Sequence, residues 1–329
     1  MSRYADNPPS RFGGTIIQWD EGEAPIPKIE LIEDQSRSIL SKNPDPSMGF
    51  AWSLNPYRGC THACAYCYAR EYHERLDLGA GVDFERVIAV KRDAPRLLEE
   101  ALSRRSWAGE AVCMSGATDC YQAIERRLEI TRACVAVLAE HKNPLLIITR
   151  SPLITRDLDL LTQLAAVGAA QVTISLPILD AERARALEPG APPPAARLRA
   201  IRALADAGVP VGVSLAPLLP GVNDELLPQA LQAAWEAGAR WAWTGLARLT
   251  PPVAAVFEER LRERLPLRAE GAIQRLRAAK DGGEAHKLTM QVFQLWTRRL
   301  GYGPPPPWPS PSPFRRPARG AQLGLFGAG

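Results

Sequence analysis

The 329-residue chain lacks the segments that would place it in or across a membrane. No uninterrupted apolar run reaches the roughly 18 residues that a membrane-spanning helix needs. The charge-free stretch 207–222 is broken by three prolines, and the first residues contain no apolar segment typical of a secretory signal. We therefore expect a soluble, cytoplasmic protein with no membrane partner.

Cysteine and net charge are also low. The chain has six cysteines, too dilute for a disulfide-stapled domain, and three of them gather within eight residues as Cys60, Cys64 and Cys67. The formal net charge is +4 and the pI is near 8.8. This small positive surplus is compatible with a nucleic-acid partner but does not require one.

Proline, by contrast, is abundant: 30 residues, or roughly 9% against a usual 5%. Its distribution divides the chain. We expect an irregular N-terminal extension over 1–48 and a disordered, proline-rich tail over 303–329. The main core is expected over 49–250, and C-terminal helices packed on it over 251–302.

The core shows alternating strand and helix patterns. A helix-like segment lies between successive apolar, β-branched runs, and three helices are expected to end at Gly168, Gly208 and Gly238. This repetition predicts a parallel sheet buried on both faces, with ligands at the carboxyl ends of the strands. The expected strands are 51–54, 87–90, 111–114, 145–149, 171–176, 209–215 and 240–244.

Three thiolates in one small volume would repel one another unless a metal centre neutralised them. We place Cys64 and Cys67 on one face of a helix, with Cys60 reaching in from the preceding loop. Three protein ligands leave a metal centre with one open, catalytic position. A structural zinc with His62 or His73 as the fourth ligand is the alternative, and it would make the chain a non-enzymatic binding module.

The spacing Cys-x-x-x-Cys-x-aromatic-Cys, with Tyr66 before the last cysteine, resembles the signature of radical S-adenosylmethionine (SAM) enzymes. The string Asn-Pro-Tyr-Arg-Gly-Cys and the later Thr-Asp-Cys-Tyr-Gln resemble the bacterial branch related to spore photoproduct lyase, also described as DNA-repair-photolyase-like. The resemblance covers about residues 53–243 and implies a partial (β/α)6 TIM-like barrel.

The resemblance also implies the cofactors and the chemistry. Cys60, Cys64 and Cys67 would bind three irons of a 4Fe–4S cluster, and SAM would chelate the fourth. An external one-electron reductant would then trigger cleavage of SAM to a 5′-deoxyadenosyl radical that abstracts hydrogen from the substrate. The implied SAM-binding residues are Tyr66 and Asn223 for the adenosine, Gly116, Thr118 and Asp119 for the amino group, and Arg150 and Ser175 for the carboxylate.

Two positions depart from the lyase pattern. The lyases have lysine where this chain has Arg150, which keeps the charge but changes the geometry. They also place a hydrogen-donating cysteine near the position of Gly116, which leaves Cys120 as the candidate donor here. The short polar side chains at these strand ends have a structural alternative, because Asp119 and Ser175 are residue types that cap helices.

The chain's partners follow from the same reasoning. We expect a lyase-like DNA-repair reaction on DNA or another nucleic acid; the alternative is modification of RNA, a peptide or a metabolite. The terminal segment Gln322–Phe326 resembles peptides with which bacterial DNA-processing proteins bind the replication sliding clamp.

Overall fold

The computed structural model describes residues 28–43, 49–279 and 283–317. Its centre is a seven-stranded sheet in the order β10-β9-β8-β7-β6-β3-β2. The first six of these strands are parallel, and β2 pairs antiparallel with β3 at the edge. Six parallel strands with helices between them form the predicted partial (β/α)6 barrel. The strands are β1 (Glu30–Glu33), β2 (Leu40–Lys42), β3 (Trp52–Leu54), β4 (Tyr57–Arg58), β5 (Val87–Val90), β6 (Val112–Met114), β7 (Leu145–Thr149), β8 (Ala170–Ser175), β9 (Val211–Ser214) and β10 (Ala242–Trp243).

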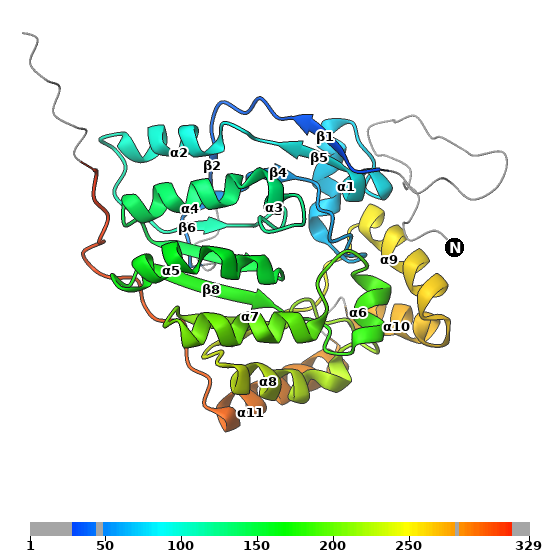
Figure 1. Ribbon diagram of the computed structural model, residues 1–329. Coiled ribbons are helices and arrows are strands. Elements are labelled where there is room, and N and C mark those ends of the chain that lie inside the picture. Colours follow the sequence, from blue (N-terminus) through cyan, green and yellow to red (C-terminus); the bar gives the residue numbers. More distant parts are fainter. Residues whose placement is uncertain (1–27, 44–48, 280–282, 318–329) are drawn as a thin grey trace, which may run out of the picture.

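Helices cover the outer face of this sheet, and α4, α5, α7 and α8 lie in that order across Figure 1. The three predicted terminating glycines have φ values of +70°, +77° and +115°, as a left-handed helix end requires. The helices are η2 (Tyr68–Leu76), α1 (Val82–Arg86), α2 (Ala94–Ser103), α3 (Glu125–Leu128), α4 (Ile130–Glu140), η3 (Pro152–Asp157), α5 (Leu158–Ala165), α6 (Ala181–Leu187), α7 (Pro194–Asp206), η4 (Asp224–Leu226), α8 (Leu227–Ala237), α9 (Pro251–Arg264), α10 (Pro266–Ala279) and α11 (Glu284–Leu300).

The core lies between the sheet and these helices. Every residue of β8 is buried, as expected for a central parallel strand that is covered on both faces, even though its residues alternate between apolar and polar. Leu54, Met114, Ile147 and Val213 come from neighbouring strands and are fully buried. Burial of each such side chain stabilises the fold by about 1.5–3 kcal/mol relative to leaving it exposed to water. Among the described residues, no helix is long and apolar enough to cross a membrane.

The N-terminal extension is more regular than its prolines suggest. Strand β1 pairs parallel with β5, and β4 pairs antiparallel with β5, giving a separate three-stranded sheet. The expectation of an irregular lead-in is therefore wrong for 30–33. It is also wrong for 40–42, because β2 pairs with β3 in the larger sheet. The predicted strand at 87–90 exists, but it belongs to this small sheet and not to the barrel. Backbone pairing with a distant strand stabilises these short segments, and no local pattern reveals that pairing.

The C-terminal helices α9–α11 form as predicted, but the tail after them is not disordered over 303–317. This segment has no helix or strand, yet it runs along the amino end of the barrel strands, at the left in Figure 1. Gln171 donates to the carbonyl of Pro306 at 2.7 Å, and Phe314 stacks on His141 with ring centroids 6.0 Å apart. Proline reduces the conformational entropy lost on ordering, which favours such docking.

Candidate cofactor site

The three clustered cysteines lie in the loop between β4 and η2, at the carboxyl end of the barrel strands. The loop consists of two tight turns: the amide of Ala63 donates to the Cys60 carbonyl, and that of Cys67 donates to the Cys64 carbonyl. Helix η2 begins only at Tyr68, so the prediction that Cys64 and Cys67 share a helix face is wrong. The turns nevertheless bring the thiols together: Cys67 packs against the two apolar clusters that contain Cys64 and Cys60, and the three thiols are close enough to interact electrostatically.

Neighbouring segments brace this loop through its backbone. Gln122 accepts from the Thr61 amide at 2.9 Å and donates to the Gly59 carbonyl at 3.2 Å. From the other side, the Gly190 amide donates to the His62 carbonyl at 3.1 Å. A Cβ at Gly190 would lie 1.9 Å from the Thr61 carbonyl oxygen, so only glycine permits this close approach. The loop geometry is thus fixed by segments distant in sequence.

Charge around the thiols is uneven. Burial raises the pKa of Cys64 and Cys67. For Cys60, burial is outweighed by the adjacent His62, and the pKa of the thiol is lowered. Burial opposes protonation of His62, yet Cys60 and Asp119 raise the pKa of this imidazole to about 9. The loop therefore contains one thiol that is ionised more easily than its two neighbours.

Asp119 lies next to this loop, but its oxygens are already occupied. Oδ1 accepts from the Thr149 hydroxyl at 2.7 Å and the Tyr121 amide at 2.9 Å, and Oδ2 accepts from the Arg150 amide at 2.9 Å. Burial would raise the pKa of Asp119, but His62 and these hydrogen bonds lower it well below its usual range. Asp119 thus holds the ends of β6 and β7 together as a carboxylate.

The Gly116 loop is open. Asn55 accepts from the amides of Gly116 and Ala117, each at 2.9 Å, and the Tyr68 hydroxyl donates to the Gly116 carbonyl. A Cβ at Gly116 would have only the Asn55 amide nitrogen within reach, at 4.0 Å. The loop therefore has room beside it at the carboxyl end of β6. Thr118 is less available, because it is buried and its hydroxyl donates to a backbone carbonyl at 3.2 Å.

Arg150 follows β7 and reaches the cysteine loop. Its NH1 lies 2.7 Å from the Cys64 sulfur, 3.0 Å from Glu188 Oε1 and 3.4 Å from the Tyr66 hydroxyl oxygen. Tyr66 is buried, and its hydroxyl also donates to Glu188. Sequence reasoning missed Glu188, the residue that ends α6; a charged residue between two helices was its only signal, and Tyr66 and Arg150 are distant from it in the sequence.

Two other predicted cofactor residues are buried near the strand ends. Ser175 is the last residue of β8. Asn223 accepts from the Leu219 amide and donates to the carbonyls of Pro177 and Pro217, each at 2.7–2.9 Å. The Asn223 amide therefore serves as a brace for the loop after β9.

Cys120, the predicted hydrogen donor, is a core residue. It is fully buried within the main core, and its backbone carbonyl accepts from Thr131 at 2.6 Å. Burial raises its thiol pKa well above the usual value. This environment is that of a packing cysteine and gives no support to the prediction of Cys120 as a hydrogen donor.

The donor set fits an iron–sulfur cluster better than a single metal ion. Among residues 28–43, 49–279 and 283–317, no three His, Cys, Asp or Glu side chains are grouped as ligands of one ion. A 4Fe–4S cluster instead takes one thiolate on each of three separate irons, so it needs neighbouring rather than convergent sulfurs. The neighbouring thiols of Cys60, Cys64 and Cys67 meet that need.

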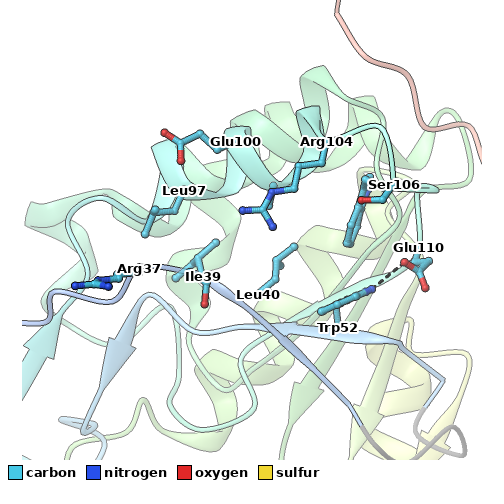
Figure 2. A pocket seen from close by; sticks show the side chains of 12 residues that line it. Arg37, Ile39, Leu40, Trp52, Leu97, Glu100, Arg104, Ser106 and Glu110 are labelled. Atoms are coloured by element: carbon cyan, nitrogen blue, oxygen red, sulfur yellow. Dashed lines mark hydrogen bonds between the residues drawn. The ribbon is translucent and has the colours of Figure 1, made fainter.

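A cavity of about 300 Å³ lies elsewhere, between α2 and strands β2 and β3. Figure 2 shows Leu97 of α2 and Arg104, which follows this helix, on one side of the cavity and Leu40 and Trp52 on the other. None of the predicted site residues lines it. The chemistry expected from the sequence therefore belongs to the carboxyl end of the strands and not to this cavity.

With this geometry established, the class of protein follows: the chain belongs to the radical SAM superfamily, whose family model matches residues 54–234. Membership implies a 4Fe–4S cluster and SAM. An uncharacterized protein of Mycobacterium tuberculosis is 36% identical over 249 residues, covering 70% of this chain and 73% of the relative. An uncharacterized protein of Methanocaldococcus jannaschii is 26% identical over 197 residues, covering 60% of this chain and 71% of the relative.

Spore photoproduct lyases are among the solved structures that share this fold. Spore photoproduct lyase in complex with dinucleoside spore photoproduct matches with a TM-score of 0.59 and 16% identity, covering 82% of this chain and 79% of the lyase. A double mutant of the lyase with bound SAM and the same lesion matches with a TM-score of 0.53 and 17% identity, covering 71% and 67%. At this identity the likeness establishes a shared fold, and it confirms the predicted barrel.

Proposed function

We propose that Cys60, Cys64 and Cys67 hold a 4Fe–4S cluster with which this enzyme cleaves SAM in order to modify DNA or another nucleic acid. The observation that carries the proposal is the trio of neighbouring cysteines, two buried and Cys67 half-buried, in a braced loop at the carboxyl end of a radical SAM barrel. When reduced by an external one-electron donor, the cluster supplies the electron that generates a 5′-deoxyadenosyl radical from SAM.

The chain's own residues bind and orient SAM. Arg150, with 17% of its side chain exposed, is the candidate partner for the SAM carboxylate, together with Ser175 at the end of the next strand. The open Gly116 loop gives the amino group room to approach the backbone. Tyr66 and Asn223 contribute to the adenosine side through the loops they brace, since their side-chain polar atoms are already bonded.

A patch of exposed aromatic side chains next to the cysteines favours a nucleic-acid substrate. Tyr68 follows Cys67 directly and is 50% exposed, and Tyr72 is 37% exposed. Their rings meet edge to face at 6.0 Å, and the Arg75 guanidinium lies 5.2 Å from the Tyr72 ring centroid. Exposed aromatic rings beside a cation provide stacking and phosphate contacts for a single strand. A base inside a duplex would have to be extruded to reach this mouth.

Support for the lyase-like repair reaction itself is weaker. It comes from fold likeness to the spore photoproduct lyases, solved with dinucleoside spore photoproduct. The Gly116 position lacks the cysteine of the lyase pattern, and Cys120 is buried. RNA, a peptide or a metabolite is therefore the alternative outcome of the substrate test. The zinc-module alternative is disfavoured by membership of the radical SAM superfamily.

The decisive experiment is anaerobic reconstitution with iron and sulfide, followed by measurement of 5′-deoxyadenosine in the presence of dithionite and SAM. We expect the parent protein to bind iron and form this product, and Cys64→Ala to lose both, since two thiolates rarely retain a cubane. A colourless protein that forms no product would overturn the proposal.

The substrate class has its own test. Removing a stacking base contact costs about 1–3 kcal/mol, so Tyr72→Ala should weaken binding of a single-stranded oligonucleotide about 5- to 150-fold. Leu295→Ala, at another exposed apolar position on α11, serves as the control and should not change binding. Equal affinity of all three proteins would count against a nucleic-acid surface at this patch.

The clamp-binding prediction concerns Gln322–Phe326, which lies outside the described residues. It remains a proposal based on the sequence. A pull-down with purified sliding clamp checks it: retention that is lost when Leu325 and Phe326 are both changed to alanine supports the contact, and retention that is unchanged removes it.

A further inference from the structure

A buried carboxylate that the proposed function does not use lies behind the cysteine loop. Glu188 caps α6 at its C-terminal end and is only 1% exposed. Its Oε1 accepts from Arg150 and from the Tyr66 hydroxyl, and its Oε2 accepts from Arg197. Both oxygens therefore have charged or hydroxyl donors, which fixes the orientation of the carboxylate.

Arg197 holds Glu188 from the side opposite the thiols. It is 1% exposed, and its Nε donates to the Pro192 carbonyl at 2.8 Å while its NH1 donates to the Ser175 carbonyl at 3.4 Å. Burial would raise the pKa of Glu188, but Arg197 and Arg150 lower it below the ordinary value. Glu188 is thus an ionised group anchored to the end of β8.

Glu188 fixes the orientation of one end of the Arg150 guanidinium. The NH1 group of Arg150 alone makes the contacts with Cys64, Glu188 and Tyr66. Within the described part of the chain its Nε and NH2 make no hydrogen bond, and the side chain is partly exposed. One end of the guanidinium is therefore fixed beside the cysteine sulfur, while two donors in a fork remain free. A fork of this kind matches a carboxylate.

We propose that Glu188, anchored by Arg197, is a positioning residue that fixes Arg150 so that its free donors meet the carboxylate of SAM beside Cys64. The inference rests on the proposed function, because it requires the cluster and SAM to bind at the cysteine loop. It adds that the affinity for SAM depends on a side chain that does not touch SAM.

A double-mutant cycle on the anaerobically reconstituted protein tests this proposal. The affinity for SAM is measured by equilibrium dialysis, and iron content and the electron paramagnetic resonance signal of the reduced cluster are measured in parallel. We expect Glu188→Gln to keep its iron and to bind SAM about 10-fold more weakly. Arg150→Met should have a similar effect, and the double variant should be no weaker than Arg150→Met alone. Asp159→Asn, at an exposed ion pair, is the control and should bind SAM normally.

The outcomes separate this inference from the function on which it rests. Additive losses, about 100-fold in the double variant, or unchanged affinity in Glu188→Gln would overturn the role of Glu188 while leaving the enzyme intact. Loss of iron from Glu188→Gln would overturn it too, because that result indicates a merely structural role. A parent protein without iron would overturn the proposed function itself, and this inference with it.

A second variant covers the case in which Glu188→Gln does not fold. Arg197→Lys keeps the charge but loses the guanidinium donors to the Pro192 and Ser175 carbonyls, which hold the Arg197 side chain against Glu188. We expect it to weaken SAM binding in the parent background and to have no further effect in the Arg150→Met background. The opposite pattern, an equal loss in both backgrounds, would refute coupling through Arg150.

Discussion

The cysteine loop also depends on a buried ionic triad. Glu85, with its side chain fully buried, lies 2.5 Å from the Arg70 guanidinium and 3.2 Å from that of Arg260. Arg70 in turn donates from Nε to the Cys64 carbonyl at 2.8 Å. The single carboxylate therefore connects η2, α1 and α9 to the loop that holds the thiols, and Glu85→Gln should weaken both the fold and the loop.

The size of the destabilisation follows from the burial of the three charged side chains. Glu85→Gln leaves two buried guanidinium groups without their anion, and breaking a buried pair costs about 3–5 kcal/mol. Arg260 already lacks hydrogen-bond partners, since its Nε and NH1 make no hydrogen bond among the described residues. The glutamine retains one acceptor oxygen, so we expect the lower end, about 3 kcal/mol. For a chain of 329 residues that corresponds to a fall in Tm of about 4 °C.

Urea unfolding followed by circular dichroism measures the effect, and iron content after reconstitution reports on the loop. Glu100→Gln is the matched control, because Glu100 pairs with Arg96 at 2.6 Å on the exposed face of α2. Exposed pairs contribute little, so its unfolding midpoint should be unchanged. If the unfolding midpoint of Glu85→Gln equals that of Glu100→Gln, the triad is solvated and its burial adds nothing to stability.

Three further outcomes are expected. Burial lowers the pKa of His73 from 6.5 to about 4. The unfolded chain therefore binds this proton at a higher pH, and the free energy of unfolding should fall by up to about 3 kcal/mol as pH falls from 6.5 to 4. Urea unfolding at a series of pH values should show a smaller pH dependence in His73→Gln than in the parent protein. The same pH dependence in both proteins would contradict the assignment to His73. Gly190→Ala forces a Cβ against the Thr61 carbonyl and should lower iron content, whereas Gly271→Ala, with open space around it, should not; equal iron content in both would contradict the close approach. Phe314→Ala removes a half-buried ring from the docked tail and should cost about 1–2 kcal/mol in urea unfolding, while no change would mean that the tail contributes nothing to stability.

The barrel could be predicted from the sequence because its signals are local. Apolar, β-branched runs separated by helical periods predict parallel strands, and the glycines at 168, 208 and 238 mark where helices end. The small sheet could not be predicted in the same way. Its strands have two to four residues, and they exist because residues 30–33 and 57–58 pair with β5, which no periodicity encodes.

Part of the candidate site could be predicted for a similar reason. The cysteine spacing is contained within eight residues, so it is visible in the sequence, and it locates the loop. Glu188 is not visible, because its meaning depends on Arg150 and Arg197, which come from other elements. A lone acidic residue in a loop looks like a solvated surface charge. Only its burial between two arginines gives it a role.

Polar residues at the carboxyl ends of parallel strands serve two purposes that the sequence cannot separate. The backbone amides at these ends need partners, and short side chains such as Asp119 and Asn223 supply them. The same ends bind ligands, so any polar residue there resembles a ligand. The structure separates the two groups by what is already bonded: the carboxylate of Asp119 and the amide of Asn223 are engaged with the protein, whereas Arg150 Nε and NH2 form no hydrogen bond with any residue that the structure describes. Recognition of SAM by side chains should therefore depend more strongly on Arg150 than on either of these bracing residues.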